Sequence, residues 1–101
     1  MANRLELHEK LCEILGSRNV YFQPPASVRL NYPAIIYSRK DIENRYADDL
    51  VYKQAFAYDV TVIDPNPDSE IVVEVSRLPT CRFDRHYKAD TLNHDVFTLY
   101  H

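Results

Sequence analysis

Two long runs with β-strand character, joined by one polar turn, most restrict what this chain can fold into. From Ala34 the run Ala-Ile-Ile-Tyr predicts the start of a buried strand, and from Val51 the sequence alternates between two faces. Turn residues occupy segment 46–50 between the runs. We therefore predict one long antiparallel hairpin over residues 34–63. One face of its second strand carries Gln54, Phe56, Tyr58, Val60 and Val62, and the other carries Ala55, Ala57, Asp59 and Thr61.

The length of this hairpin is informative in itself. About 13 residues per strand at roughly 3.3 Å each give about 40 Å, whereas a domain of about 100 residues has a radius of gyration of roughly 13 Å. Residues 38–45 also lose the clean apolar alternation, as strands do when no core lies beneath them. The sequence therefore predicts a hairpin that projects beyond the core of its own domain.

The segment before the hairpin predicts a helix and a short strand. Residues 3–15 have the periodicity of an amphipathic helix, and Gly16 is placed to end it. Residues 19–23 are aromatic and β-branched enough for a short strand, and the proline pair that follows predicts a loop or sheet-edge crossover over residues 24–32. The apolar stripe of the helix is expected to be Leu5, Leu11, Cys12 and Leu15.

A second helix is predicted after the hairpin. The run Asp64-Pro-Asn-Pro-Asp68 breaks the strand, and Asn66 followed by Pro67 fits an N-cap with proline at the first helical position. Pro79 is expected to end this helix. Its apolar stripe is Ile71, Val72, Val75 and Leu78.

The last part of the chain predicts a second hairpin. Residues 80–88 and 94–100 form its strands, and residues 89–93 form its turn. In the first strand, Cys81, Phe83 and Arg85 are expected on one face, with Arg82, Asp84 and His86 on the other. The complete order predicts a single α+β domain over residues 1–101, with a mainly antiparallel sheet, the long projecting hairpin and two helices on one face.

Composition argues against several classes of function. The chain has 101 residues, 12 basic and 15 acidic, and its net charge of −3 gives no general attraction to nucleic acid. A single glycine excludes glycine-rich phosphate loops. No apolar run reaches membrane-spanning length, and the N-terminus lacks the profile of a signal peptide, so we expect a cytosolic product. Cys12 and Cys81 are expected to face the core as free thiols.

Acidic and histidine side chains gather in the last hairpin, which raises the question of a metal site. Asp84, His86, Asp90, His94 and Asp95 lie there, and His86 and His94 could face each other across the turn. None of the usual zinc-ligand spacings occurs, however. We therefore expect no metal, no cofactor and no catalytic residue, and a metal-dependent hydrolase using Asp84, His86 and His94 stands as the alternative from a different class.

Interleaved charges and abundant tyrosine favour a protein contact surface instead. Both signs alternate along the long hairpin, which suits registry between copies of one protein, and the eight tyrosines exceed what a core of this size needs. Arg82 and Lys88 add charge to the last hairpin. The predicted contact residues are Arg39, Asp41, Glu43, Arg45 and Asp48 on the long hairpin, and Asp84, Arg85, His86, Asp90, Asn93 and His94 on the last one.

Four segments of the chain, residues 20–25, 32–39, 58–69 and 81–94, carry a family resemblance. They resemble small structural proteins of long-tailed bacteriophages, specifically the tail terminators, also called tail completion or head–tail joining proteins. The resemblance spans nearly the whole chain. Its segments are Val20-Tyr-Phe-Gln-Pro-Pro25, Tyr32-Pro-Ala-Ile-Ile-Tyr-Ser-Arg39, Tyr58-Asp-Val-Thr-Val-Ile-Asp-Pro-Asn-Pro-Asp-Ser69 and Cys81-Arg-Phe-Asp-Arg-His-Tyr-Lys-Ala-Asp-Thr-Leu-Asn-His94.

This resemblance implies a non-enzymatic virion subunit of α+β fold. Such subunits form a ring, usually a hexamer, at the head-proximal end of the tail tube, where they end tube polymerisation and present a surface to the neck of the head. The implied partners are further copies of the chain, the tail tube protein and a head-closure or neck protein. DNA only passes through the lumen, and the particle is assembled in the host cytoplasm. A neck or head-closure component is the alternative within the same class.

Overall fold

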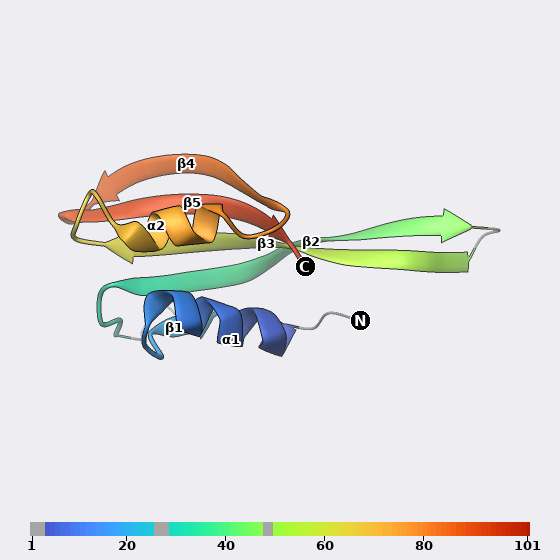
Figure 1. Cartoon of the computed structure of the whole chain (residues 1–101), viewed down its shortest axis with the longest axis horizontal. Coiled ribbons are helices and arrows are strands. Elements are labelled where there is room, and N and C mark those ends of the chain that lie inside the picture. Colours follow the sequence, from blue (N-terminus) through green and yellow to red (C-terminus); the bar gives the residue numbers. More distant parts are fainter. Residues whose placement is uncertain (1–3, 26–28, 48–49) are drawn as a thin grey trace.

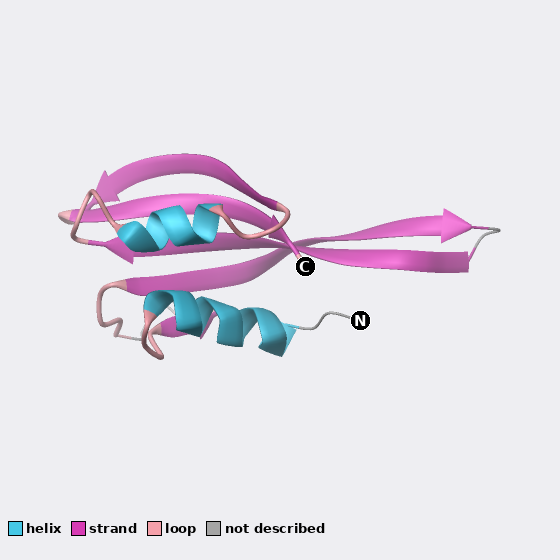
Figure 2. Ribbon diagram, in the orientation of Figure 1, coloured by secondary structure: helices cyan, strands magenta, loops and turns pink. Residues whose placement is uncertain are grey.

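The protein is an α+β domain built on one five-stranded sheet (Figures 1 and 2). The computed structural model describes residues 4–25, 29–47 and 50–101, and the side chains of these residues outside 43–55. The strand order is β1-β2-β3-β5-β4, and every neighbouring pair is antiparallel except β1 and β2. The predicted α+β class with a mainly antiparallel sheet and two helices is thus confirmed. The elements are α1 (Arg4–Leu15), β1 (Val20–Phe22), β2 (Ala34–Ala47), β3 (Leu50–Asp64), α2 (Glu70–Ser76), β4 (Cys81–Ala89) and β5 (Leu92–Tyr100).

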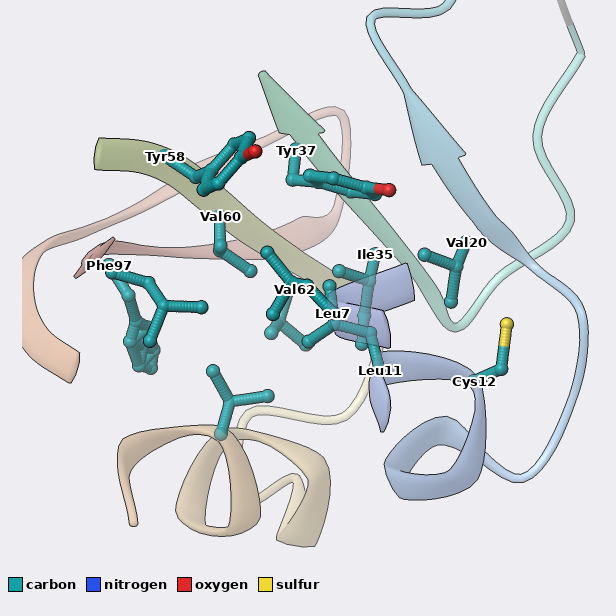
Figure 3. Packing of buried hydrophobic residues seen from close by; sticks show 12 residues of the cluster. Leu7, Leu11, Cys12, Val20, Ile35, Tyr37, Tyr58, Val60, Val62 and Phe97 are labelled. Carbon is teal, nitrogen blue, oxygen red and sulfur yellow. The ribbon is translucent and has the colours of Figure 1, made fainter. Parts of the chain in front are cut away.

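Both helices cover the same face of the sheet, and the core lies between them and the strands. Figure 3 shows Val60 and Phe97 of the sheet gathered with Leu7 and Leu11 of α1 in this layer. Inward positions alternate along β3, as the period of two predicted. The buried cluster comprises Leu7, Leu11, Cys12, Val20, Ile35, Tyr37, Tyr58, Val60, Val62, Val75, Phe97 and Leu99.

The buried stripe of α1 differs from the predicted one. Leu7 and Leu11 are 1% and 0% exposed, whereas Leu5 is 64% exposed. Leu7 and Leu11 are four residues apart and share a face, but Leu5 lies two residues from Leu7 and therefore points away. The prediction that Leu5 packs in the core was wrong. Gly16 ends the helix as predicted, with φ +78° and its N–H donating to the Cys12 carbonyl oxygen at 2.9 Å.

The N-terminus of α2 also differs from the prediction. Ser69 is the N-cap, and its side-chain oxygen accepts a hydrogen bond from the Ile71 N–H at 3.2 Å. Asn66 instead belongs to two consecutive turns before the helix. Its N–H donates to Asp64 Oδ1 at 2.8 Å, and its own Oδ1 accepts from the Asp68 N–H at 3.0 Å. The helix therefore begins later than the Asn66-Pro67 pair suggested.

Strands β2 and β3 pair along their whole length, from Ala34 opposite Ile63 to Ala47 opposite Leu50. Strand β5 pairs with β3 only from Ala57 onward. The backbone of His101 also exchanges two hydrogen bonds with Phe56. We call residues 43–47 and 50–55 the distal ribbon, because among the described residues these two segments pair only with each other. In Figure 1 this part continues to the right, past the helices and the other strands. The molecule measures 51 × 25 × 23 Å.

Strand β4 forms one edge of the sheet and is almost entirely exposed. Eight of its nine residues are exposed, and Cys81 alone is half-buried. The pairing with β5 shifts between Phe83, which is opposite Phe97, and Arg85, which is opposite Val96. Asp84 is the extra residue of this bulge, so the side-chain alternation reverses there. The prediction that Arg85 shares a face with Phe83 was therefore wrong.

Candidate protein interface

The first group of predicted contact residues lies on or beside the distal ribbon. Arg39 is exposed, and its guanidinium lies 5.4 Å from the centre of the Phe56 ring. Asp41 is exposed next to a bulge, where its Oδ1 accepts from the Ile42 N–H at 2.8 Å. Ile42 itself is 41% exposed. Apolar and charged groups thus alternate at the base of this ribbon.

Three further predicted residues continue toward the tip. Glu43 and Arg45 lie in β2, in register with Ala55 and Lys53 of β3. Asp48 lies outside the described residues. Glu43 and Arg45 are thus placed in the part of the ribbon that has no further strand beside it among the described elements.

The second group lies on β4 and β5. Asp84 and Arg85 are both exposed and approach to 4.0 Å, and such a surface pair contributes little to stability. The Arg85 guanidinium also lies 5.9 Å from the centre of the Tyr87 ring. Arg85 is thus held above β4 by weak contacts and stays accessible to a partner.

His86 and His94 do not face each other. His86 is opposite Asp95 in the ladder, and its Nδ1 lies 2.7 Å from Asp95 Oδ1. His94 is opposite Tyr87, on which its ring stacks with centroids 4.7 Å apart, and its Nδ1 donates to the Leu92 carbonyl oxygen at 3.2 Å. His86 therefore shares a face with Asp95, which is the neighbour of His94 in β5. Because neighbouring residues of a strand point to opposite faces, the two imidazoles diverge.

This divergence corrects the expectation that the two histidines could face each other across the turn. It also separates the residues on which the alternative metal site depended, with Asp84 in the bulge, His86 bound to Asp95 and His94 on the other face. Within the described part of the chain, no group of three or more His, Cys, Asp and Glu residues is arranged to hold a metal ion.

Asp90 lies in the turn of the last hairpin and Asn93 at the start of β5, and they differ in exposure. Asp90 is exposed, and with Thr91 it forms a two-residue turn in which both φ angles are positive, 51° and 65°. Asn93 is only 6% exposed, and its Nδ2 donates to the carbonyl oxygens of Asp64 and Pro65. Asn93 therefore holds the loop after β3 and is not placed on the surface, which corrects its assignment as a contact residue.

Exposed aromatic side chains give the last hairpin an apolar component. The alternation of residues between the two strand faces did not indicate this component. Phe83 is 53% exposed, although its ring edge packs on Phe97 at 5.5 Å between centroids. Tyr87 and Tyr100 are 42% and 39% exposed, whereas Tyr37 and Tyr58 are buried. The sequence predicted surface tyrosines as a group. The exposure of Phe83 was missed, because a side chain on the core-facing side of an edge strand still meets solvent on one side.

A small cleft of about 270 Å³ lies beside the exposed aromatic residues. Lys40 lies on its wall, 3.7 Å from Asp59 Oδ1, and donates to Thr98 Oγ1 at 3.4 Å. These contacts hold the ammonium group at the cleft. The other lining residues are Arg82, Phe83, Asp84, Thr98 and Tyr100.

A larger open groove of about 550 Å³ runs along α1, on another part of the molecule. Glu9 lies on its rim and forms an ion pair with Arg18, with nitrogen–oxygen distances of 2.9 and 3.1 Å. This pairing raises the pKa of Arg18. The groove is lined by Leu5, Glu6, Glu9, Lys10, Glu13 and His101, and a neighbouring hollow of about 120 Å³ shares Lys10 and His101 with it.

Both cysteines face the core, as predicted. Cys12 is buried in the core, and Cys81, at the start of β4, packs against the same core. Burial raises the pKa of the Cys81 thiol, which disfavours the nucleophilic thiolate.

Comparison with known proteins finds no matching family model and no significantly similar curated protein. None of the helices in the described part of the chain has the length and apolar character needed to cross a bilayer.

Proposed function

We propose that this chain is a structural virion subunit of a long-tailed bacteriophage. It would assemble with copies of itself into a ring at the head-proximal end of the tail tube, end tube polymerisation and provide the surface to which the head is joined. Its partners would be the tail tube protein and a head-closure or neck protein, with DNA passing through the lumen.

The observation that carries this proposal is the pairing of the distal ribbon. Within the described chain, residues 43–47 and 50–55 pair only with each other, so the outward-pointing backbone hydrogen-bonding groups of both segments are left for other molecules. An isolated two-stranded ribbon is marginally stable in water. Contacts with neighbouring subunits would supply the burial that this domain's own core does not.

A second support is the exposed edge at β4. Exposed edge strands favour uncontrolled pairing between molecules, and proteins protect them with charge, with bulges or by covering them. Strand β4 has charged residues and a bulge at Asp84. A closed ring would give this edge a defined neighbour. The four segments of sequence that resemble tail terminators include β1, the start of β2, the end of β3, and β4 with the start of β5.

The proposal is tested by adding the purified chain to polymerising tail tube protein and measuring tube length by electron microscopy. We expect shorter tubes with density at one end. In infected cells, loss of the chain should give overlong tails. Full heads without tails, together with tubes of unchanged length in vitro, would assign the chain to the neck instead. Unchanged tubes and normal particles would contradict both roles.

A further inference from the structure

We infer that two surfaces of this chain are complementary to each other, so that the basic edge strand β4 of one copy binds the acidic groove along α1 of the next. This inference rests on the proposed function, because it identifies the subunit contact of the proposed ring.

The β4 surface is basic and partly aromatic. Arg82, Arg85 and Lys88 are all exposed, and Asp84 is the only acidic residue in the strand. Arg82, Arg85 and Tyr87 share one face of the edge strand, and Lys88 lies on the other. Tyr87 is 42% exposed. Aromatic residues and arginine are the residue types enriched in protein interfaces. This surface therefore suits a partner that offers carboxylates around an apolar patch.

The α1 groove offers that combination. Glu6, Glu9 and Glu13 follow one another at spacings of three and four residues, which places them on one side of the helix. All three are exposed, and Lys10 is the only basic side chain from α1 that lines the groove. Leu5, which is 64% exposed, supplies an apolar group among them.

The two surfaces belong to separate parts of the molecule. Helix α1 packs beside β1 and β2, whereas β4 is the opposite edge of the sheet, and Figure 1 shows them on opposite sides of the domain. One chain therefore cannot bring its own β4 into its own groove. The contact must form between two copies.

A contact between two unlike surfaces also leads to a particular type of assembly. Antiparallel pairing of β4 with β4 of a second copy about its centre would place Arg85 opposite Arg85, and like charges directly across a strand pair are destabilising. A contact from β4 to the groove joins subunits head to tail, and such contacts generate closed rings or open filaments. A ring needs this type of interface.

Charge-reversal variants of the full-length chain test the inference by sedimentation velocity. Arg82→Glu/Arg85→Glu reverses one face of β4, and Glu9→Lys/Glu13→Lys reverses the groove. A further variant carries all four substitutions. Arg29→Glu/Arg77→Glu, at two exposed arginines outside both surfaces, changes the net charge as much as the β4 pair does. Circular dichroism and thermal unfolding check that every variant folds.

We expect the ring species to be lost in each surface variant at concentrations where the unmodified chain is fully assembled. It should persist in the Arg29/Arg77 control and return in the four-substitution chain, because both surfaces are then reversed together. Rings in both surface variants would overturn this inference while leaving the proposed ring function intact. An unmodified chain that stays monomeric up to its solubility limit, with and without tail tube protein, would overturn both.

Discussion

The side-chain amide of Asn93 donates to the backbone carbonyl oxygen of Asp64 at 3.2 Å, at the point where β3 ends beside the start of β5. The same nitrogen lies 3.3 Å from the carbonyl oxygen of Pro65. Asn93 thus joins the last hairpin to the loop that precedes α2. One buried amide therefore connects two parts of the chain that are distant in sequence.

Replacing Asn93 with alanine should lower the free energy of unfolding by about 1–3 kcal/mol, because a buried backbone carbonyl is left without its partner. Urea denaturation measures the change. Asn31→Ala, at an exposed position, serves as the control and should lie within about 0.5 kcal/mol of the unmodified chain. Equal effects of the two substitutions would contradict a structural role for Asn93.

The buried stripe of α1 predicts that replacing two leucines of this helix with alanine has very different effects on stability. Leu11→Ala removes a fully buried side chain and should cost about 2–5 kcal/mol, whereas Leu5→Ala, at a position that is 64% exposed, should cost little. Chemical denaturation of both variants measures the difference. A larger cost at Leu5 would mean that α1 packs with the face predicted from its sequence pattern.

The turn of the last hairpin predicts a stabilising substitution. Thr91 is β-branched and has a φ of 65°, a region that glycine occupies without strain. Thr91→Gly should therefore raise the free energy of unfolding by up to about 1 kcal/mol, since Asp-Gly is a preferred pair in this type of turn. Thr98→Gly in the interior of β5 is the matched control and should destabilise. A loss of stability with Thr91→Gly would argue against the turn described here.

Tyr37 predicts a loss of stability at alkaline pH. Its hydroxyl accepts from Arg4 at 3.2 Å and lies 2.8 Å from His8 Nδ1, and burial raises its pKa above the ordinary value of 10.0. Above about pH 10 the unfolded chain therefore releases this proton while the folded chain keeps it. Stability from this group is complete below pH 10 and falls as the pH rises toward the folded-state pKa.

Chemical denaturation at several pH values, from about 8 to about 11, measures this dependence, because this range includes the ordinary tyrosine pKa of about 10. Tyr37→Phe should lose less stability across that range than the unmodified chain. Cys81, whose pKa is also raised by burial, contributes equally to both chains and cancels in the comparison. Parallel curves for the two chains would contradict the assignment to Tyr37.

The elements with a strict period were predictable from the sequence, and those set by a single local contact were not. The faces of β3 followed from alternation through Phe56, Tyr58 and Val60, because a one-residue slip would have reversed every side chain. On α1, Leu5 and Leu7 both continue an apolar pattern through Leu11, and only the position of the sheet decides between them. A bulge such as that at Asp84 leaves no periodic signal, so the face of Arg85 could not be predicted.

The candidate interface divides in the same way. The sequence indicated charged and aromatic residues on the last hairpin, and the structure exposes Arg85, Tyr87 and Phe83 there. It did not indicate that Asn93 is buried, because a polar residue in a turn segment is usually solvated. The acidic groove of α1 was also not predicted, since it depends on which side of the helix faces the core.

The central claim is that sister subunits occupy the surfaces this domain leaves uncovered, and mass photometry of the full-length chain tests it most directly. Measured alone and with tail tube protein, the chain should give particles whose mass is a fixed small multiple of the single chain, with six copies expected. Only particles of single-chain mass under both conditions would contradict the account.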